Sequence, residues 1–163
     1  MNASVANLLE SPIIPAVEIA GVRIGDTRDQ VLAKIGKPSF ARPGLRKPIY
    51  RERLHYAGLS VALEEFKVFM VIAEVGYKGA TKEGLRAGAS WSELNQIYPN
   101  VAFYETKMVW YVPGINGMSF SIVRPPHLHE IPAMIPYVDE EYQMVDPTGA
   151  FVYSISVHDL RYD

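Results

Sequence analysis

The sequence predicts an α+β fold in which two tandem repeats, each a helix followed by antiparallel strands, share one sheet and place their helices on one face of it. The segment GVRIGDTRDQV at residues 21–31 matches GLRAGASWSEL at residues 84–94. Each copy ends in a capping box, Thr27-x-x-Gln30 and Ser90-x-x-Glu93, which marks the start of a helix. The strand-like segment GLSVAL at residues 58–63 likewise matches GMSFSI at residues 117–122. A period this long indicates one small helix-and-strand unit used twice.

The repeats divide the chain into an N-terminal arm and two units. The arm covers residues 1–20, the first repeat residues 21–75 and the second repeat residues 76–163. The second repeat carries a long loop insert at residues 124–150, where the first repeat has a tight turn. The insert is rich in proline, and loops of this length without regular structure are often functional or mobile. It is the main difference between the two copies.

In the arm and the first repeat, periodic apolar patterns alternate with turn signals. The apolar positions after the first cap form one helical stripe, and Gly36 and Pro38 end the helix. A loop rich in Pro, Gly and basic residues follows at about 39–49, and Glu65–Lys67 reads as a hairpin turn. The expected elements are a helical turn near 5–9, a strand at 17–19, a helix at 28–35, and strands at 50–56, 59–63 and 68–75.

The second repeat follows the same order of elements. Its helix begins after Ser90 and ends at Pro99-Asn100, because proline cannot continue a helix. The expected elements are a helix at about 91–98 and strands at about 101–112, 118–123 and 151–157.

Alternation along the strands predicts two different faces of the sheet. Large apolar residues occupy one set of positions and small residues the other. The large set comprises Leu59, Val61, Leu63, Met118, Phe120, Ile122, Tyr153, Ile155 and Val157, and the small set comprises Ser60, Ala62, Ser119, Ser121, Ser154 and Ser156. We expect the large residues to meet the helices. The Ser/Ala face would then permit close approach of another chain, unless the insert or the arm covers it.

Composition restricts the classes of function. The chain has 163 residues, a net charge of −2 and no cysteine. A disulfide framework, a thiol nucleophile and cysteine-based zinc are excluded. A net charge of this sign and size gives no electrostatic reason to expect binding to nucleic acid or to an anionic membrane. We expect no membrane span and no secretory signal, and hence a cytoplasmic protein. A small basic run is interpreted as a solvated loop: Arg42, Arg46, Lys47, Arg51 and Arg53.

The repeated motif, Gly-hydrophobic-Arg-x-Gly-x-[Thr/Ser]-x-x-[Gln/Glu]-hydrophobic, is followed by a helix and antiparallel strands. It resembles the β-lactamase inhibitor protein fold and the related SmpA/OmlA small-lipoprotein domain. The residues that carry the resemblance are Gly21 to Val31 with Gly36-Lys37-Pro38, and Gly84 to Leu94. The tandem arrangement over roughly residues 20–160 is more similar to the inhibitor protein. The resemblance implies a binding protein that contacts its target through a concave sheet face and loops. The inhibitor's cysteines and the lipoprotein's lipobox cysteine are absent from this chain.

No motif specifies catalysis, and we expect no catalytic residue, cofactor or resident metal. The segment His127-Leu128-His129-Glu130 would put two imidazoles on one side of an extended loop, but it has no evident third ligand. Ser60 and Ser119 follow a Gly-x pattern, but they lie inside expected strands and lack the second glycine of a nucleophile elbow.

The residues most suited to binding are aromatic side chains of the second repeat and an acidic stretch of the insert. Trp and Tyr dominate the binding energy of protein interfaces. The acidic stretch would dock onto a basic partner, or lie in solvent as a charged loop. The candidate partner-binding residues are Trp91, Tyr104, Trp110, Tyr111, Tyr137, Asp139, Glu140, Glu141 and Tyr142. Alternation puts Trp110 and Tyr111 on opposite faces, so at least one of them points away from the helices.

These features favour a non-enzymatic protein-binding module. Its most specific form is an immunity or inhibitor protein that occludes a cognate bacterial toxin or enzyme encoded nearby. Two alternatives stay open. One is an SmpA/OmlA-like envelope or small-ligand-binding domain, and the other is a metal-dependent enzyme that uses His127 and His129. The sequence does not specify an oligomeric state.

Overall fold

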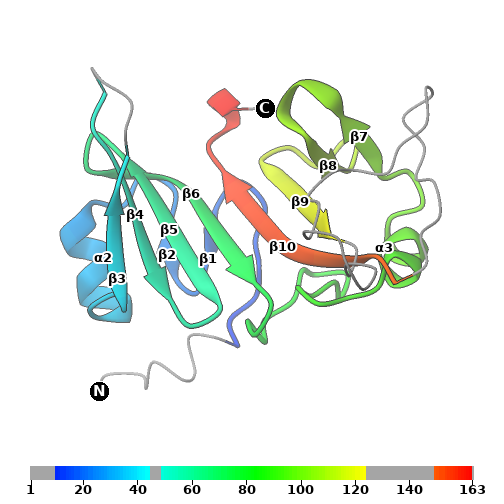
Figure 1. Cartoon of the computed structure of the whole chain (residues 1–163), viewed down its shortest axis with the longest axis horizontal. Coiled ribbons are helices and arrows are strands. Elements are labelled where there is room, and N and C mark those ends of the chain that lie inside the picture. Colours follow the sequence, from blue (N-terminus) through cyan, green and yellow to red (C-terminus); the bar gives the residue numbers. More distant parts are fainter. Residues whose placement is uncertain (1–9, 45–48, 124–148, 163) are drawn as a thin grey trace, which may run out of the picture.

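The computed structural model describes residues 10–44, 49–123 and 149–162. The fold is α+β: an antiparallel sheet of eight strands, a sheet of two strands and two α-helices (Figure 1). The small sheet pairs β1 (Glu18–Ile19) with β2 (Val22–Arg23), and the helices are α2 (Arg28–Ile35) and α3 (Trp91–Ile97). The large sheet has the order β3-β4-β5-β6-β10-β9-β8-β7. Its strands are β3 (Phe40–Pro43), β4 (Arg51–Tyr56), β5 (Leu59–Glu64), β6 (Lys67–Glu74), β7 (Ala102–Tyr104), β8 (Val109–Tyr111), β9 (Met118–Val123) and β10 (Phe151–His158).

The expected helices and most expected strands are confirmed within one or two residues, but two expectations are wrong. The single strand expected over 101–112 is a hairpin, because the 3₁₀ turn Glu105–Lys107 and the left-handed Met108 (φ 56°) separate β7 from β8. The loop expected at 39–49 contains β3, which pairs with β4 through Phe40↔His55 to Pro43↔Glu52. Proline is tolerated there because β3 lies at the edge of the sheet. The helical turn expected at 5–9 and most of the insert lie outside the described residues.

The two helices begin in the same way. In α2 the Gln30 amide donates to Thr27 Oγ1 (3.3 Å) and the Thr27 amide donates to Gln30 Oε1 (2.7 Å). In α3 the Glu93 amide donates to Ser90 Oγ (3.2 Å) and the Ser90 amide donates to Glu93 Oε2 (2.7 Å). Both predicted capping boxes are therefore confirmed.

A glycine before each cap ties the helix entry to the sheet. The Gly25 amide donates to the Val68 carbonyl of β6, and the Gly88 amide donates to the Val152 carbonyl of β10, both at 2.7 Å. The two glycines have φ of 90° and 95°, which L-residues with a side chain rarely adopt. The repeated sequence motif thus fixes how each helix enters and where it meets a central strand.

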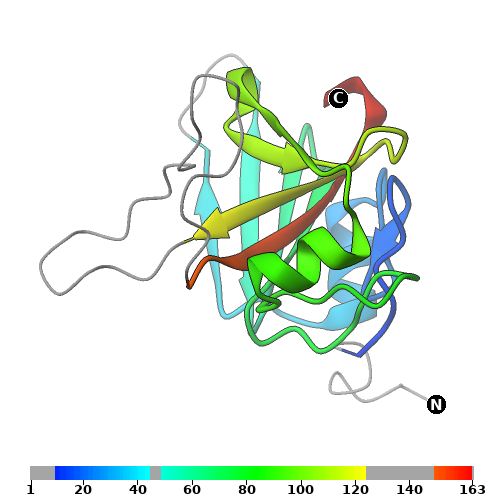
Figure 2. The ribbon, with the colours of Figure 1, turned by 90° about the vertical axis from the view of Figure 1, so that its right-hand side faces the viewer.

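The centre of the large sheet is the antiparallel pair of β6 and β10, which runs from Ser154↔Glu74 to His158↔Met70. Val71, Ala73, Ile155 and Val157 share one face of this pair and are fully buried. They belong to one core cluster with Val31 and Ile35 of α2 and Leu94 of α3. Figure 2 shows both helices and the β1–β2 hairpin on the same side of the large sheet. The apolar face of the sheet is therefore covered, and its other face is not covered by these elements.

One residue that was expected on the core face, Tyr153, lies elsewhere. The register between β10 and β9 shifts between Val152 and Ser154, so Tyr153 has no opposite residue. The shift puts Val152, and not Tyr153, on the core face: Val152 is 0% exposed and Tyr153 is 40% exposed. A β-bulge of this kind places two residues opposite one and changes the alternation beyond it. The expectation for Tyr153 is thus wrong.

We expect Thr27→Ala and Ser90→Ala each to lower the free energy of unfolding by about 1 kcal/mol at neutral pH, because each removes a side-chain cap. Urea unfolding followed by circular dichroism measures the change. A loss below about 0.3 kcal/mol for both variants would show that the caps contribute little to stability.

The two caps should differ in their dependence on pH. Hydrogen bonds from the Ser90 amide and hydroxyl hold the pKa of the Glu93 carboxyl below its usual value. This contribution is present above the unfolded-state pKa and is lost as the pH falls through the folded-state pKa. The cost of Ser90→Ala should therefore shrink below about pH 4. The first cap uses the neutral Gln30, so the cost of Thr27→Ala should stay constant, and an equal pH dependence of both variants would contradict this assignment.

Gly117 joins the arm to the sheet, since its carbonyl accepts from the amides of Ala16 (3.2 Å) and His158 (3.0 Å). Its φ is 71°, and an added Cβ would lie 2.5 Å from the Ala16 Cβ. We expect Gly117→Ala to cost about 3 kcal/mol, from backbone strain together with overpacking. The matched variant Gly25→Ala has φ of 90° but open space around the new Cβ, so it should cost only about 1 to 2 kcal/mol. Equal losses in urea unfolding would refute the close contact with Ala16.

Candidate functional site

The open face is the side of the large sheet that points away from the two helices. One row of paired residues crosses all eight strands on this side. The row comprises Phe40, His55, Ser60, Ile72, Ser156, Ser119, Tyr111 and Ala102. The predicted set of small residues, Ser60, Ala62, Ser119, Ser121, Ser154 and Ser156, lies on this face, which confirms that expectation.

The small residues form the floor of the open face, and larger side chains stand on both sides of them. Ser60, Ser119 and Ser156 are 0%, 8% and 8% exposed, although neither described helix lies on this side. They are shielded because short side chains lie below the level of their longer neighbours. Phe40 at one end of the row is 58% exposed, and Tyr111, next to the other end, is 37% exposed. Exposed aromatic side chains therefore stand on either side of the shielded serines along the row.

The β3–β4 side of the open face is basic and aromatic. The Phe40 ring stacks on His55 with centroids 4.1 Å apart. Burial, followed by the nearby charges of Arg53 and Arg42, lowers the pKa of His55, against an opposing effect of Glu74. A positive charge on His55 is thus disfavoured, which suits its stacked position.

Two ion-paired arginines stand beside this stack. The Arg53 guanidinium donates to Ser60 Oγ (2.9 Å) and lies 3.5 Å from Glu74, while Ser60 Oγ donates to Glu74 at 3.0 Å. Arg51 pairs with Glu64 at 2.6 Å. The expectation of a solvated basic loop is therefore wrong for Arg42, Arg51 and Arg53, which lie in strands, while Arg46 and Lys47 lie outside the described residues. No ion pair joins Arg42 to another described residue.

The β7–β8 side of the open face is aromatic with a single lysine. The rings of Tyr104 and Tyr111 lie 6.1 Å apart in an edge-on arrangement, and both are more than a third exposed. The Lys107 ammonium lies 5.1 Å from the centre of the Tyr104 ring, in the geometry of a cation–π contact. Lys107 comes from the 3₁₀ turn that was not expected from the sequence.

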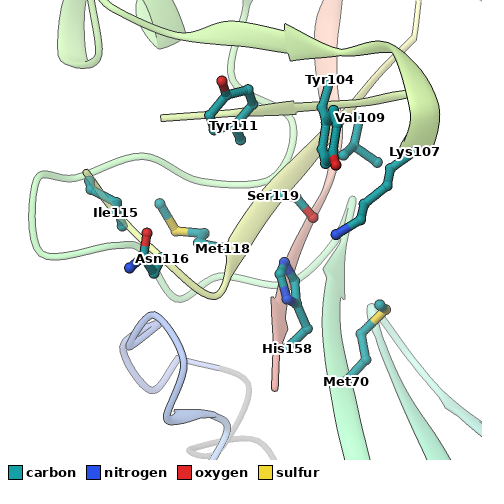
Figure 3. Close-up of a pocket in the computed structure, with 10 residues that line it drawn as sticks. All are labelled: Met70, Tyr104, Lys107, Val109, Tyr111, Ile115, Asn116, Met118, Ser119 and His158. Atoms are coloured by element: carbon teal, nitrogen blue, oxygen red, sulfur yellow. The ribbon is translucent and has the colours of Figure 1, made fainter. Parts of the chain in front are cut away.

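Two pockets lie along the open face and meet at Met70. The first has a volume of about 370 Å³ and lies between Met70, Lys107, Tyr111 and His158 (Figure 3). The second has a volume of about 480 Å³ and lies on the β3–β4 side, next to the arginines. Because Met70 lines both, the two hollows are neighbours on the open face, and we call the two together the trough.

The structure divides the predicted partner-binding residues into three groups. Tyr104 and Tyr111 lie on the open face. Trp110 is 3% exposed on the core face, where its ring packs edge-on against the half-buried Trp91 at 4.8 Å. This core packing leaves Trp110 without a surface to offer a partner. The remaining predicted residues, Tyr137, Asp139, Glu140, Glu141 and Tyr142, lie outside the described residues, as do His127, His129 and Glu130.

Several residues of the open face were missed by sequence reasoning. The expected strand at 50–56 contains Arg51, Arg53 and His55 at alternate positions. Alternation could therefore have predicted that these three side chains share one face of the sheet. Phe40 and Arg42 gave no such signal because β3 is a short edge strand that ends in a proline. Met70 and His158 join one hollow only because β6 and β10 are paired.

Two further searches concern residues 10–44, 49–123 and 149–162 only. No group of three or more His, Asp or Glu side chains within them is arranged to hold a metal ion. Neither of the helices in these ranges has the length and apolar character needed to cross a bilayer.

Comparison with protein-family models, curated proteins and solved structures finds no match for this chain. The chemistry and shape of the open face are therefore what support a function.

Proposed function

We propose that this chain is a non-enzymatic protein-binding module. In its most specific form it is an immunity or inhibitor protein that covers the active site of a cognate bacterial toxin or enzyme. The observation that carries the proposal is the trough of the open face, with a floor of small side chains and exposed aromatic residues at both ends. A floor of serines permits close approach of a partner backbone, and the aromatic ends supply the rigid anchors common in protein interfaces.

The size of the open face fits a protein partner. Eight strands at the usual spacing span about 34 Å. A stable interface of standard size buries about 800 Å² on each partner, which a face of this width can supply. A convex partner surface would enter the trough and contact both ends at once.

The charges suggest what that partner presents. Glu64 and Glu74 on the open face are already engaged by Arg51 and Arg53. Arg42 stands beside them without an ion pair among the described residues, and Lys107 lies at the other end. The partner surface is therefore expected to be acidic opposite β3, since opposite charges favour association and fix orientation.

The proposal includes two tandem repeats that share the large sheet. The strand order supports this, because the four strands that follow α2 and the four that follow α3 each run, in chain order, from an edge of the sheet inward to the central β6–β10 pair. The paired hydrogen bonds of Gly25 and Gly88 support it as well. Such a duplication would double the width of a sheet that one repeat could not extend alone.

The test uses the protein encoded beside this chain as the candidate partner. The two are co-expressed, and the dissociation constant and the partner's residual activity are measured. Phe40→Ala and Tyr111→Ala should each weaken binding at least about tenfold, because each removes an exposed aromatic anchor. Ser121→Trp should weaken it further by placing a large side chain on the open face, since Ser121 is only partly buried and is one of the small residues of that face.

Phe66→Ala is the matched control. Phe66 is 54% exposed, lies in the β5–β6 turn and belongs neither to the row of residues that crosses the open face nor to its small residues. It should leave the dissociation constant unchanged. If all three variants of the trough bind the partner as the unaltered chain does, the open face is not the binding surface. If the neighbouring protein neither binds nor is inhibited, the proposed immunity role for this pair is refuted.

A further inference from the structure

The pocket on the β7–β8 side of the open face has the size and lining of a small-molecule site. Its volume of about 370 Å³ lies in the range of ligand pockets. Most of its lining is apolar or aromatic, from the side chains of Met70, Tyr104, Val109, Tyr111, Ile115 and Met118. Thioether and aromatic side chains together adapt well to a flat ring, because sulfur makes favourable contacts with ring edges.

Besides the tyrosine hydroxyls, the described polar side chains that line this pocket are Lys107, Asn116, Ser119 and His158, and all of these except Asn116 converge. Figure 3 shows the Lys107 ammonium, the Ser119 hydroxyl and the His158 ring directed toward the same space. His158 is 5% exposed, and its Nδ1 lies 3.4 Å from the Asp159 carbonyl oxygen. Ser119 is 8% exposed and projects from β9 between them.

Among the described residues that line the pocket there is no aspartate or glutamate, whereas Lys107 is one of them. The nearby Asp159 is held by Arg161, whose guanidinium lies 2.9 Å from its carboxylate, and this contact lowers the pKa of Asp159. A ligand with one negative charge would therefore find a complementary cation and a hydroxyl donor at the mouth of an apolar cavity.

We propose that this pocket binds a small apolar carboxylic acid. Its carboxylate would meet Lys107 and Ser119, and its ring or chain would lie between Met70, Met118 and Tyr111. A phosphate ester fits less well, because a single lysine would face two negative charges, and a sugar would leave hydroxyls unpaired against the apolar lining. The inference goes beyond the proposed protein partner and does not require one.

The test is a chemical-shift titration of the full chain with three probes: 3-phenylpropionate, its neutral amide 3-phenylpropionamide, and acetate. The carboxylate with the ring should bind at least about tenfold more tightly than either the amide or acetate, because only it satisfies both the cation and the apolar lining. The shifted resonances should include the methyl groups of Met70 and Met118.

Two lysine variants separate a specific site from general attraction. Lys107→Met keeps the length of the side chain and removes its charge, so it should abolish the preference for the acid over the amide. Lys37→Met removes an exposed lysine just after α2 that does not line the pocket, and should preserve the preference. Ser119→Leu should weaken both ring-bearing probes by filling the pocket.

The proposal is overturned if the amide binds as tightly as the acid, if the shifts fall outside the pocket, or if Lys107→Met and Lys37→Met behave alike. Tighter binding of a blocked Phe-Glu dipeptide than of the free acid would also overturn it, since the pocket would then take a side chain of a protein. The partner test with Phe40→Ala reports on the opposite end of the trough. Failure of one proposal is therefore distinguishable from failure of the other.

Discussion

The antiparallel pairing of β6 with β10 lies at the middle of the large sheet, and both faces of the molecule follow from it. On the core side it brings Val71 and Ala73 against Ile155 and Val157 in one apolar layer. On the open side the same pairing sets Met70 beside His158. The two strands are about 80 residues apart in sequence. Because one register fixes both layers, a slip of one residue would exchange the core with the trough.

The helix entries hold this central pair from the core side. Gly25 and Gly88 donate to carbonyls of β6 and β10, one each, immediately before the two capping boxes. The helices are short, and a helix of this length has little stability by itself. Their caps and their docking onto the sheet therefore act together. Neither described helix packs against the open face, which lies on the other side of the sheet.

Part of the fold could be predicted because it depends on interactions between residues that are close in the sequence. A capping box acts within four residues, so both helix starts were confirmed. Alternation is also local, and it identified the Ser/Ala floor in β5 and β9. The prediction failed where pairing between distant segments decides the structure. β3 exists because β4 pairs with it, and the bulge at Tyr153 depends on where β10 meets β9. Trp110 lies in the core because Trp91 and Phe103 pack against it.

The amino-acid sequence by itself determined the class of fold, the two helix starts and the contrast between a large-residue and a small-residue face, because each depends on neighbours within one element. Only the tertiary structure decided that the small-residue face is a trough. Phe40 comes from the edge strand β3, Tyr111 comes from β8 next to the other edge, and Met70 of the central pair lines both hollows between them. The heights of side chains on eight separate strands create that shape, and no single segment contains it.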